Sequence, residues 1–82
     1  MTREIFLYSR KNCSLCLDLQ NHLQPLLTGK DVSLQVIDID NDAELLHRYG
    51  ARVPVLVTGQ REICELRLDV DALQAWLQEG QD

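Results

Sequence analysis

Aromatic residues are scarce in this 82-residue chain, which has one Phe, two Tyr and one Trp. Apolar residues nevertheless make up 45% of the sequence, which is typical of a globular protein and not of a disordered one. A chain of this length buries only about 60% of the surface that its unfolded form exposes. We therefore predict one small domain, residues 1–82, whose thin core consists mainly of Leu, Val and Ile.

The sequence also lacks a basic excess, a long apolar run and an apolar leader segment. Its net charge of −5 argues against binding to nucleic acid or to an anionic membrane surface. Its longest apolar run, Val53–Val57, is far shorter than the roughly 20 residues of a membrane-spanning helix. Residues 1–4 show no basic start followed by an apolar stretch. We expect a cytoplasmic protein, and we expect a monomer.

Cysteine is too rare for a secreted disulfide scaffold, because the chain has three cysteines and only two of them are close together. Those two form the motif Cys13-Ser14-Leu15-Cys16. In a reducing compartment, a single CxxC pair is more often catalytic or metal-binding than a permanent structural bridge. The cysteine pattern therefore narrows the chemistry to a redox pair or a metal site.

Apolar periodicity and turn residues predict the element order β-α-β-α-β-β-α. The predicted strands are residues 4–9, 32–39, 53–57 and 62–66, and the helices start near residues 13, 42 and 70. Strands that alternate with helices favour a parallel pair, and the terminal hairpin adds antiparallel strands. The predicted fold class is α/β, with a central four-stranded mixed sheet flanked by helices. The second and third strands should be mostly buried.

Several residues are expected to set the helix boundaries. Asn12, Asn41 and Asp69 can act as N-caps. Pro25 should kink or end the first helix near residues 23–24, because it lacks an N–H and its ring clashes with the preceding turn. The remaining expectations are turn or cap roles for Asp38 and Asp40, helix stops at Gly50 and Gly80, and a buried stripe of Val70, Leu73, Trp76 and Leu77 on the last helix.

The CxxC pair lies where a predicted strand meets a predicted helix, and this position favours redox chemistry. Unpaired backbone N–H groups and the positive end of the helix dipole favour a thiolate over a thiol. Cys13, at the helix start, is expected to be the exposed nucleophile. Cys16 falls on the apolar stripe, so we expect a buried thiol that resolves a mixed disulfide. Arg10 and Lys11 add positive charge that should favour the Cys13 thiolate further.

Other interpretations of the pair remain open: a zinc site, a permanent structural disulfide and a CxxC without any chemistry. Zinc normally takes about four ligands. The residues left to supply them are Cys64, His22 and His47, which lie on different predicted elements. We therefore expect no metal. Cys64 is expected to be a small buried apolar residue, with a regulatory thiol as the alternative.

Three segments together give the chain a family resemblance: Leu7–Cys16, Asp38–Asp40 and Arg52–Leu56. The chain has a strand followed by CxxC and a helix, and Val-Pro opens its third strand. This arrangement is similar to that of the glutaredoxin-like branch of the thioredoxin superfamily. The resemblance covers almost the whole chain and implies a thioredoxin-like fold. It also implies that Pro54 is cis and packs beside the disulfide, and that the backbone of Val53 binds an extended substrate.

The chain departs from that family in two places. Ser14 and Leu15 stand where glutaredoxins usually carry Pro-Tyr. Residues 64–69 lack the Gly-Gly pair that, in the family, holds the γ-glutamyl end of glutathione. Arg10 or Lys11 could still bind the glycyl carboxylate. The resemblance thus leaves glutathione and a protein dithiol as possible reductants.

These observations predict a thiol–disulfide oxidoreductase that reduces protein or glutathione mixed disulfides. The expected catalytic residues are Cys13 and Cys16, and the expected substrate-binding residues are Arg10, Lys11, Val53 and Pro54. No bound cofactor is expected. The alternatives are a redox-inactive binding or assembly module with this fold, and a metal-holding protein that uses the CxxC pair.

Overall fold

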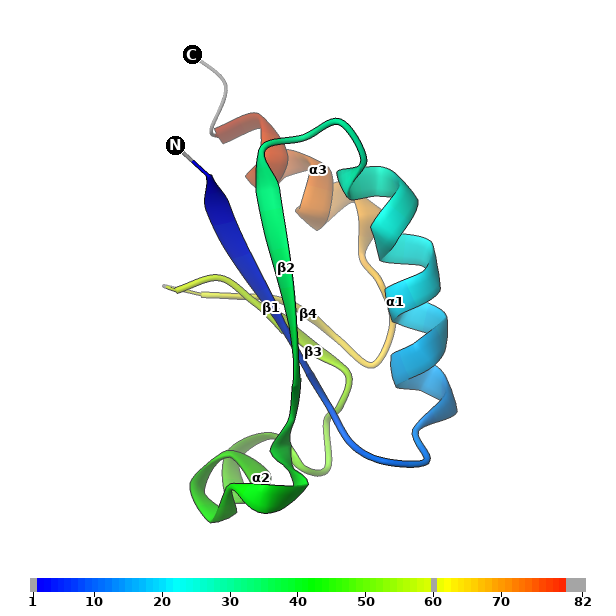
Figure 1. Ribbon diagram of the computed structural model, residues 1–82, viewed down its shortest axis with the longest axis vertical. Helices are drawn as coiled ribbons and strands as arrows, with labels where there is room; N and C mark the ends of the chain where they lie inside the picture. Colours follow the sequence, from blue (N-terminus) through cyan, green and yellow to red (C-terminus); the bar gives the residue numbers. More distant parts are fainter. Residues whose placement is uncertain (1, 60, 80–82) are drawn as a thin grey trace.

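The computed structural model describes residues 2–59 and 61–79 as an α/β fold (Figure 1). Its elements follow the predicted order, with a short 3-10 turn before the second helix. They are β1 (Arg3–Ser9), α1 (Ser14–Leu27), β2 (Val32–Asp38), η1 (Ile39–Asn41), α2 (Ala43–Tyr49), β3 (Val55–Val57), β4 (Glu62–Glu65) and α3 (Val70–Glu79). None of the helices in these residues is long and apolar enough to cross a membrane.

The four strands form one mixed sheet in the order β2-β1-β3-β4. β1 and β2 are parallel, with Ser9 opposite Asp38 at their carboxyl ends. β3 runs antiparallel to both β1 and β4, and all three of its residues are buried, as expected for a strand covered on both faces. The predicted sheet is confirmed. Its parallel pair brings the end of β2 beside the loop that leads to the two cysteines.

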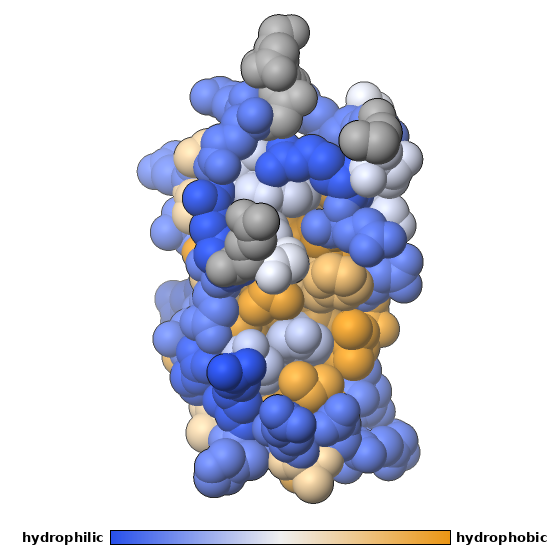
Figure 2. Space-filling view, turned by 90° about the vertical axis from the view of Figure 1, so that its left-hand side faces the viewer, coloured by the Kyte–Doolittle hydropathy of each residue, from blue (hydrophilic) through white to orange (hydrophobic). Residues whose placement is uncertain are grey.

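Helices cover the two faces of the sheet unequally. α1 and α3 lie together on one face of the sheet (Figure 1). Their apolar side chains, among them Trp76, pack against Leu7 and Leu56 of the sheet. α2 lies on the other face at the carboxyl end of β2, and its Tyr49 packs with Val55. Figure 2 looks onto this second face, where apolar side chains gather above the level of α2. The larger buried cluster therefore lies on the face that α1 covers.

The expected N-cap of α1 and its expected end near residues 23–24 are wrong. The N-cap is Cys13, whose side chain accepts a hydrogen bond from the Cys16 N–H, whereas Asn12 has a φ of 58° in the preceding turn. Asn tolerates this left-handed conformation better than most residues. Pro25 does not end the helix, which continues to Leu27. Proline near the helix end leaves a single carbonyl without its N–H partner, and Leu27, two residues further on, is buried against the core.

β2 and α2 also differ from expectation. β2 lies at the edge of the sheet, so Gln35 and Val36 are exposed and the strand is not mostly buried. α2 is capped by Asp42, whose Oδ1 accepts a hydrogen bond from the Leu45 N–H at 3.0 Å. Asn41 cannot take this position because it belongs to η1. The 3-10 turn thus moves the cap by one residue.

α3 begins as predicted. Asp69 Oδ1 accepts a hydrogen bond from the Ala72 N–H at 3.0 Å, and Leu73 and Trp76 are buried. Val70 was predicted to be buried with them, but at the first helical position it points away from the core and is exposed. The expected stop at Gly80 lies outside the described residues.

Candidate functional site

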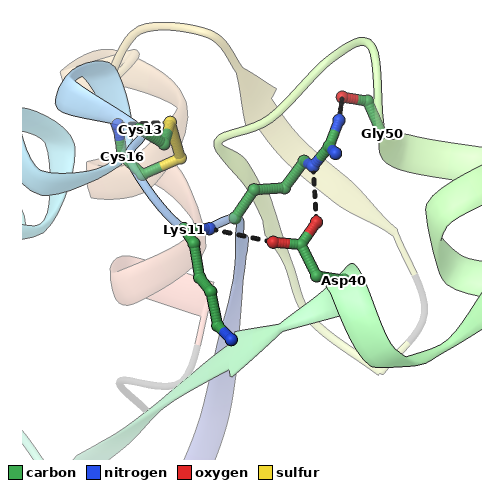
Figure 3. Close-up of a disulfide and its surroundings, with 6 residues drawn as sticks. Lys11, Cys13, Cys16, Asp40 and Gly50 are labelled. Carbon is green, nitrogen blue, oxygen red and sulfur yellow. Dashed lines mark hydrogen bonds and ion pairs between the residues drawn. A yellow bond between two sulfur atoms is a disulfide. The ribbon is translucent and has the colours of Figure 1, made fainter.

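The two cysteines lie at the junction of β1 and α1 (Figure 3). They form a disulfide, and their Cα atoms are 5.2 Å apart, an ordinary separation for a disulfide. The backbone N–H of Cys16 donates a hydrogen bond to Sγ of Cys13 at 3.1 Å. Backbone N–H groups at a helix start are donors that stabilise a thiolate over a thiol.

The two cysteines differ in exposure. Cys16 is 4% exposed and packs on the buried side of α1, whereas Cys13 is only half-buried. Cys13 lines a depression at the start of α1. Besides the two cysteines, the residues that line it are Ser9, Arg10, Asn12, Ser14, Leu17 and Gln20. A second molecule can therefore reach Cys13 more easily than Cys16, and the expected difference in exposure is confirmed.

The loop before Cys13 is held by Asp40. Its Oδ1 accepts a hydrogen bond from Arg10 Nε at 2.7 Å, and its Oδ2 accepts one from the backbone N–H of Lys11 at 3.1 Å (Figure 3). Arg10 also donates to the carbonyl of Gly50 at 3.4 Å. The Arg10 guanidinium, and after it the Lys11 N–H, hold the pKa of the Asp40 carboxyl below its usual value. The cysteine loop is thereby attached to η1 and to the end of α2.

These contacts change the role expected of the two basic residues. Arg10 lines the depression at Cys13, but its charge is paired with Asp40, so it is not a lone cation beside the sulfur. The Lys11 side chain points away from the disulfide (Figure 3). The donor that contacts the Cys13 sulfur is the backbone N–H of Cys16, at the helix start.

The Val53–Pro54 peptide bond is cis and lies just before β3. Pro54 is fully buried and Val53 is half-buried. The carbonyl of Pro54 accepts a hydrogen bond from the Leu66 N–H at 2.8 Å, and the preceding Arg52 pairs with Glu62 at 2.9 Å. These contacts fix the loop against β4 and the segment that follows it. Neither Val53 nor Pro54 lines the depression at Cys13, so their role in substrate binding stays a prediction.

The third cysteine and the two histidines do not join the pair. Cys64 lies in β4, half-buried and without a disulfide partner among the described residues, and burial raises the pKa of its thiol. His22 and His47 are exposed on α1 and α2. Within residues 2–59 and 61–79, no three His, Cys, Asp or Glu side chains are grouped so that they could hold a metal ion.

Asp40 is the site residue whose contacts the sequence analysis missed. It was given a turn or cap role, whereas the structure pairs it with Arg10. A signal was present in the sequence, because the carboxyl ends of parallel strands meet at one edge of a sheet. Ser9 lies opposite Asp38, so the residues after each of them approach one another.

The fold and the site together define a class of protein: a thioredoxin fold with a CxxC pair at the start of its first helix. The glutaredoxin-like domain family (DUF836) matches residues 4–78, and the chain belongs to this family. A search of curated proteins found no match to the chain.

Three solved structures are similar to the chain. Protein Ne2328 from Nitrosomonas europaea is 33% identical with a TM-score of 0.82, and the match covers 93% of this chain and 92% of that one. Protein XcR50 from X. campestris is 34% identical with a TM-score of 0.70, covering 93% and 97%. A mutant thioredoxin from Halobacterium salinarum is 25% identical with a TM-score of 0.62, covering 96% and 74%.

Proposed function

We propose that the protein is a thiol–disulfide oxidoreductase in which Cys13 attacks the substrate and Cys16 resolves the mixed disulfide. The observation that carries this proposal is the hydrogen bond from the Cys16 N–H to the Cys13 sulfur at the helix start. A thiolate at that point gains a backbone donor and the positive end of the helix dipole. Cys16, in contrast, is shielded from solvent. The two thiols therefore differ in the way that a nucleophile and a resolving thiol must differ.

The reaction has two exchange steps. The Cys13 thiolate attacks one sulfur of the substrate disulfide, a new S–S bond forms, and the other substrate sulfur leaves as a thiolate. The Cys16 thiol then loses its proton to solvent and attacks the Cys13 sulfur. This attack closes the Cys13–Cys16 disulfide and releases the second substrate thiolate. The substrate gains two electrons, and the protein is left with the disulfide that the structure contains.

The neighbouring residues have proposed roles in substrate binding. The pairing of β3 with β1 begins at Val55, so the backbone of Val53 lies outside that pairing and can hydrogen-bond to an extended peptide beside Pro54. Lys11 can bind a carboxylate, and Arg10 can do so through N–H groups that Asp40 and Gly50 leave unused. In this proposal the protein works as a cytoplasmic monomer without a bound cofactor, and glutathione or a protein dithiol restores its thiols.

A titration in glutathione redox buffers tests the proposal. We expect the Cys13–Cys16 pair to pass reversibly between dithiol and disulfide in one two-electron transition, with about 30 mV for each tenfold change in the equilibrium constant. The thiols are trapped by rapid alkylation and counted by mass spectrometry. The Cys64→Ser variant is the control and should follow the same curve. A pair that stays oxidised in a large excess of reduced glutathione would be a structural bridge, and the proposal would fail.

A further inference from the structure

Large apolar side chains are exposed in the first turn of α1 and on the segment that follows β4. Leu15, Leu17, Leu66 and Val70 are each between 44% and 59% exposed. Leu15 lies between the two cysteines, and Leu17 lines the depression at Cys13. Single exposed apolar residues are common, but a group of them in one place marks a binding surface.

Three of these residues, Leu15, Leu66 and Val70, line one groove with a volume of about 680 Å³. One wall of the groove is α1, from Leu15 to Leu26. The other wall is formed by Leu66, Arg67 and Leu68, which follow β4, and by Val70, the first residue of α3; this part of the chain passes beside α1 in Figure 1. At a rise of about 1.5 Å per helical residue, the α1 wall is about 16 Å long. That length accommodates about five residues of an extended peptide.

The α1 wall of the groove begins next to the redox site, because Leu15 lies between the two cysteines in the sequence. Leu15 joins the α1 wall to the cysteines, and the opposite wall is attached to the cis-proline loop by the hydrogen bond from the Leu66 N–H to the Pro54 carbonyl. Leu66 has a φ of 67°, in the left-handed region that favours glycine. The chain therefore keeps an exposed leucine at a backbone position that glycine would adopt more easily, and this leucine faces the groove.

We propose that the groove binds an apolar side chain of a protein substrate, within a few residues of the substrate's reacting cysteine. This proposal rests on the oxidoreductase function proposed above. Glutathione consists of glutamate, cysteine and glycine, so it has no apolar side chain that could fill the groove. A peptide with a leucine near its cysteine has one. The polar groups in the groove are Asp18, His22 and Arg67, which can meet the peptide backbone without selecting peptides of one net charge.

The probes are short peptides whose single cysteine carries a nitrothiobenzoate mixed disulfide. In one set a leucine occupies, in turn, each of about five positions on either side of the cysteine, and in the matched set a serine replaces that leucine. Attack by the reduced protein releases the coloured nitrothiobenzoate, and the second-order rate constant is measured. We expect the best leucine peptide to react about tenfold faster than its serine partner, because the leucine side chain leaves water on binding.

Two variants and a control locate the effect. Leu66→Gly relieves the backbone at a positive φ, and Val70→Ser replaces an exposed residue at the start of α3, so both should fold. In each, the ratio of leucine to serine peptide rates should fall toward one. Val36→Ser is the matched control, because Val36 is 43% exposed, close to the 44% of Leu66, but lies on β2 outside the groove. Its ratio should equal that of the wild type.

The outcomes separate this proposal from the function on which it rests. Equal rates for every leucine and serine pair with the wild type would overturn the groove proposal and leave the oxidoreductase function intact. Release from none of the peptides would overturn both. Sedimentation tests another occupant: a wild-type dimer that Val70→Ser dissociates would show that a second copy of the chain fills the groove, and the proposal would be wrong.

Discussion

Replacing Cys13 with serine is expected to abolish disulfide exchange, whereas replacing Cys16 with serine should trap the mixed disulfide. The reason is the difference in their positions. Cys13 is the half-buried N-cap of α1 and its sulfur accepts a hydrogen bond from the Cys16 N–H, so in the proposed mechanism it is the thiol that meets the substrate. Cys16 is 4% exposed, so in the proposed mechanism it attacks only the Cys13 sulfur of the mixed disulfide. Without Cys16, the first step proceeds and the second cannot.

Mass spectrometry under non-reducing conditions follows both variants after mixing with a peptide disulfide. The Cys16→Ser protein should gain the mass of one peptide, and digestion should place the adduct on Cys13. The Cys13→Ser protein should gain none. Cys64→Ser, in which both active-site thiols remain, is the control and should turn over at the wild-type rate. An adduct on Cys16 in the Cys13→Ser protein, formed as fast as the adduct on Cys13, would reverse the assignment of the two roles.

Leu23→Ala is expected to lower the free energy of unfolding by about 3 kcal/mol, because it removes fully buried methyl groups and leaves a cavity. Leu23 is 0% exposed and lies in the core cluster that packs α1 against the sheet. A domain of this size has a total stability of roughly 4–12 kcal/mol. One leucine in a core with so few aromatic residues therefore carries a large share of it, and this packing also fixes the helix that bears both cysteines.

Urea unfolding of the oxidised protein, followed by circular dichroism, measures this loss. Leu17→Ala is the matched control on the same helix, because Leu17 is exposed, and its effect should stay within about 0.5 kcal/mol. The slope of the free energy against urea should be the same for both variants if the folded state is preserved. Equal losses for the two variants would mean that α1 is not packed through Leu23.

The parts of the fold that follow from side-chain periodicity could be predicted from the sequence. The apolar run Val53–Val57 indicated a central strand, and the structure has that strand at Val55–Val57 with all three residues buried. The spacing of Cys16 on the leucine stripe of α1 predicted its burial, and Asp69 was recognised as a cap because its side chain satisfies a local N–H group. These features depend on residues close in sequence or on a regular repeat.

The features that were missed depend on the position of an element within the whole fold. The composition of β2 is that of a buried strand, but its place at the sheet edge leaves Val36 exposed. The pairing of Arg10 with Asp40 requires the register of two parallel strands. The groove requires the segment after β4 to pass beside α1, which brings Leu66 near Leu15 from a distant part of the sequence. Local propensity carries none of this information.

The pH dependence of Cys13 alkylation in the reduced protein tests the central claim most directly, because it reports the ionisation of the proposed nucleophile. The Cys64→Ser background removes the third thiol, and peptide mapping separates Cys13 from Cys16. An ordinary cysteine thiol is half-ionised at about pH 8.5. If the helix start favours the Cys13 thiolate, the alkylation rate should reach half its maximum clearly below that pH, and Cys13 should react before Cys16. A half-maximal rate at pH 8.5 or above would contradict the account.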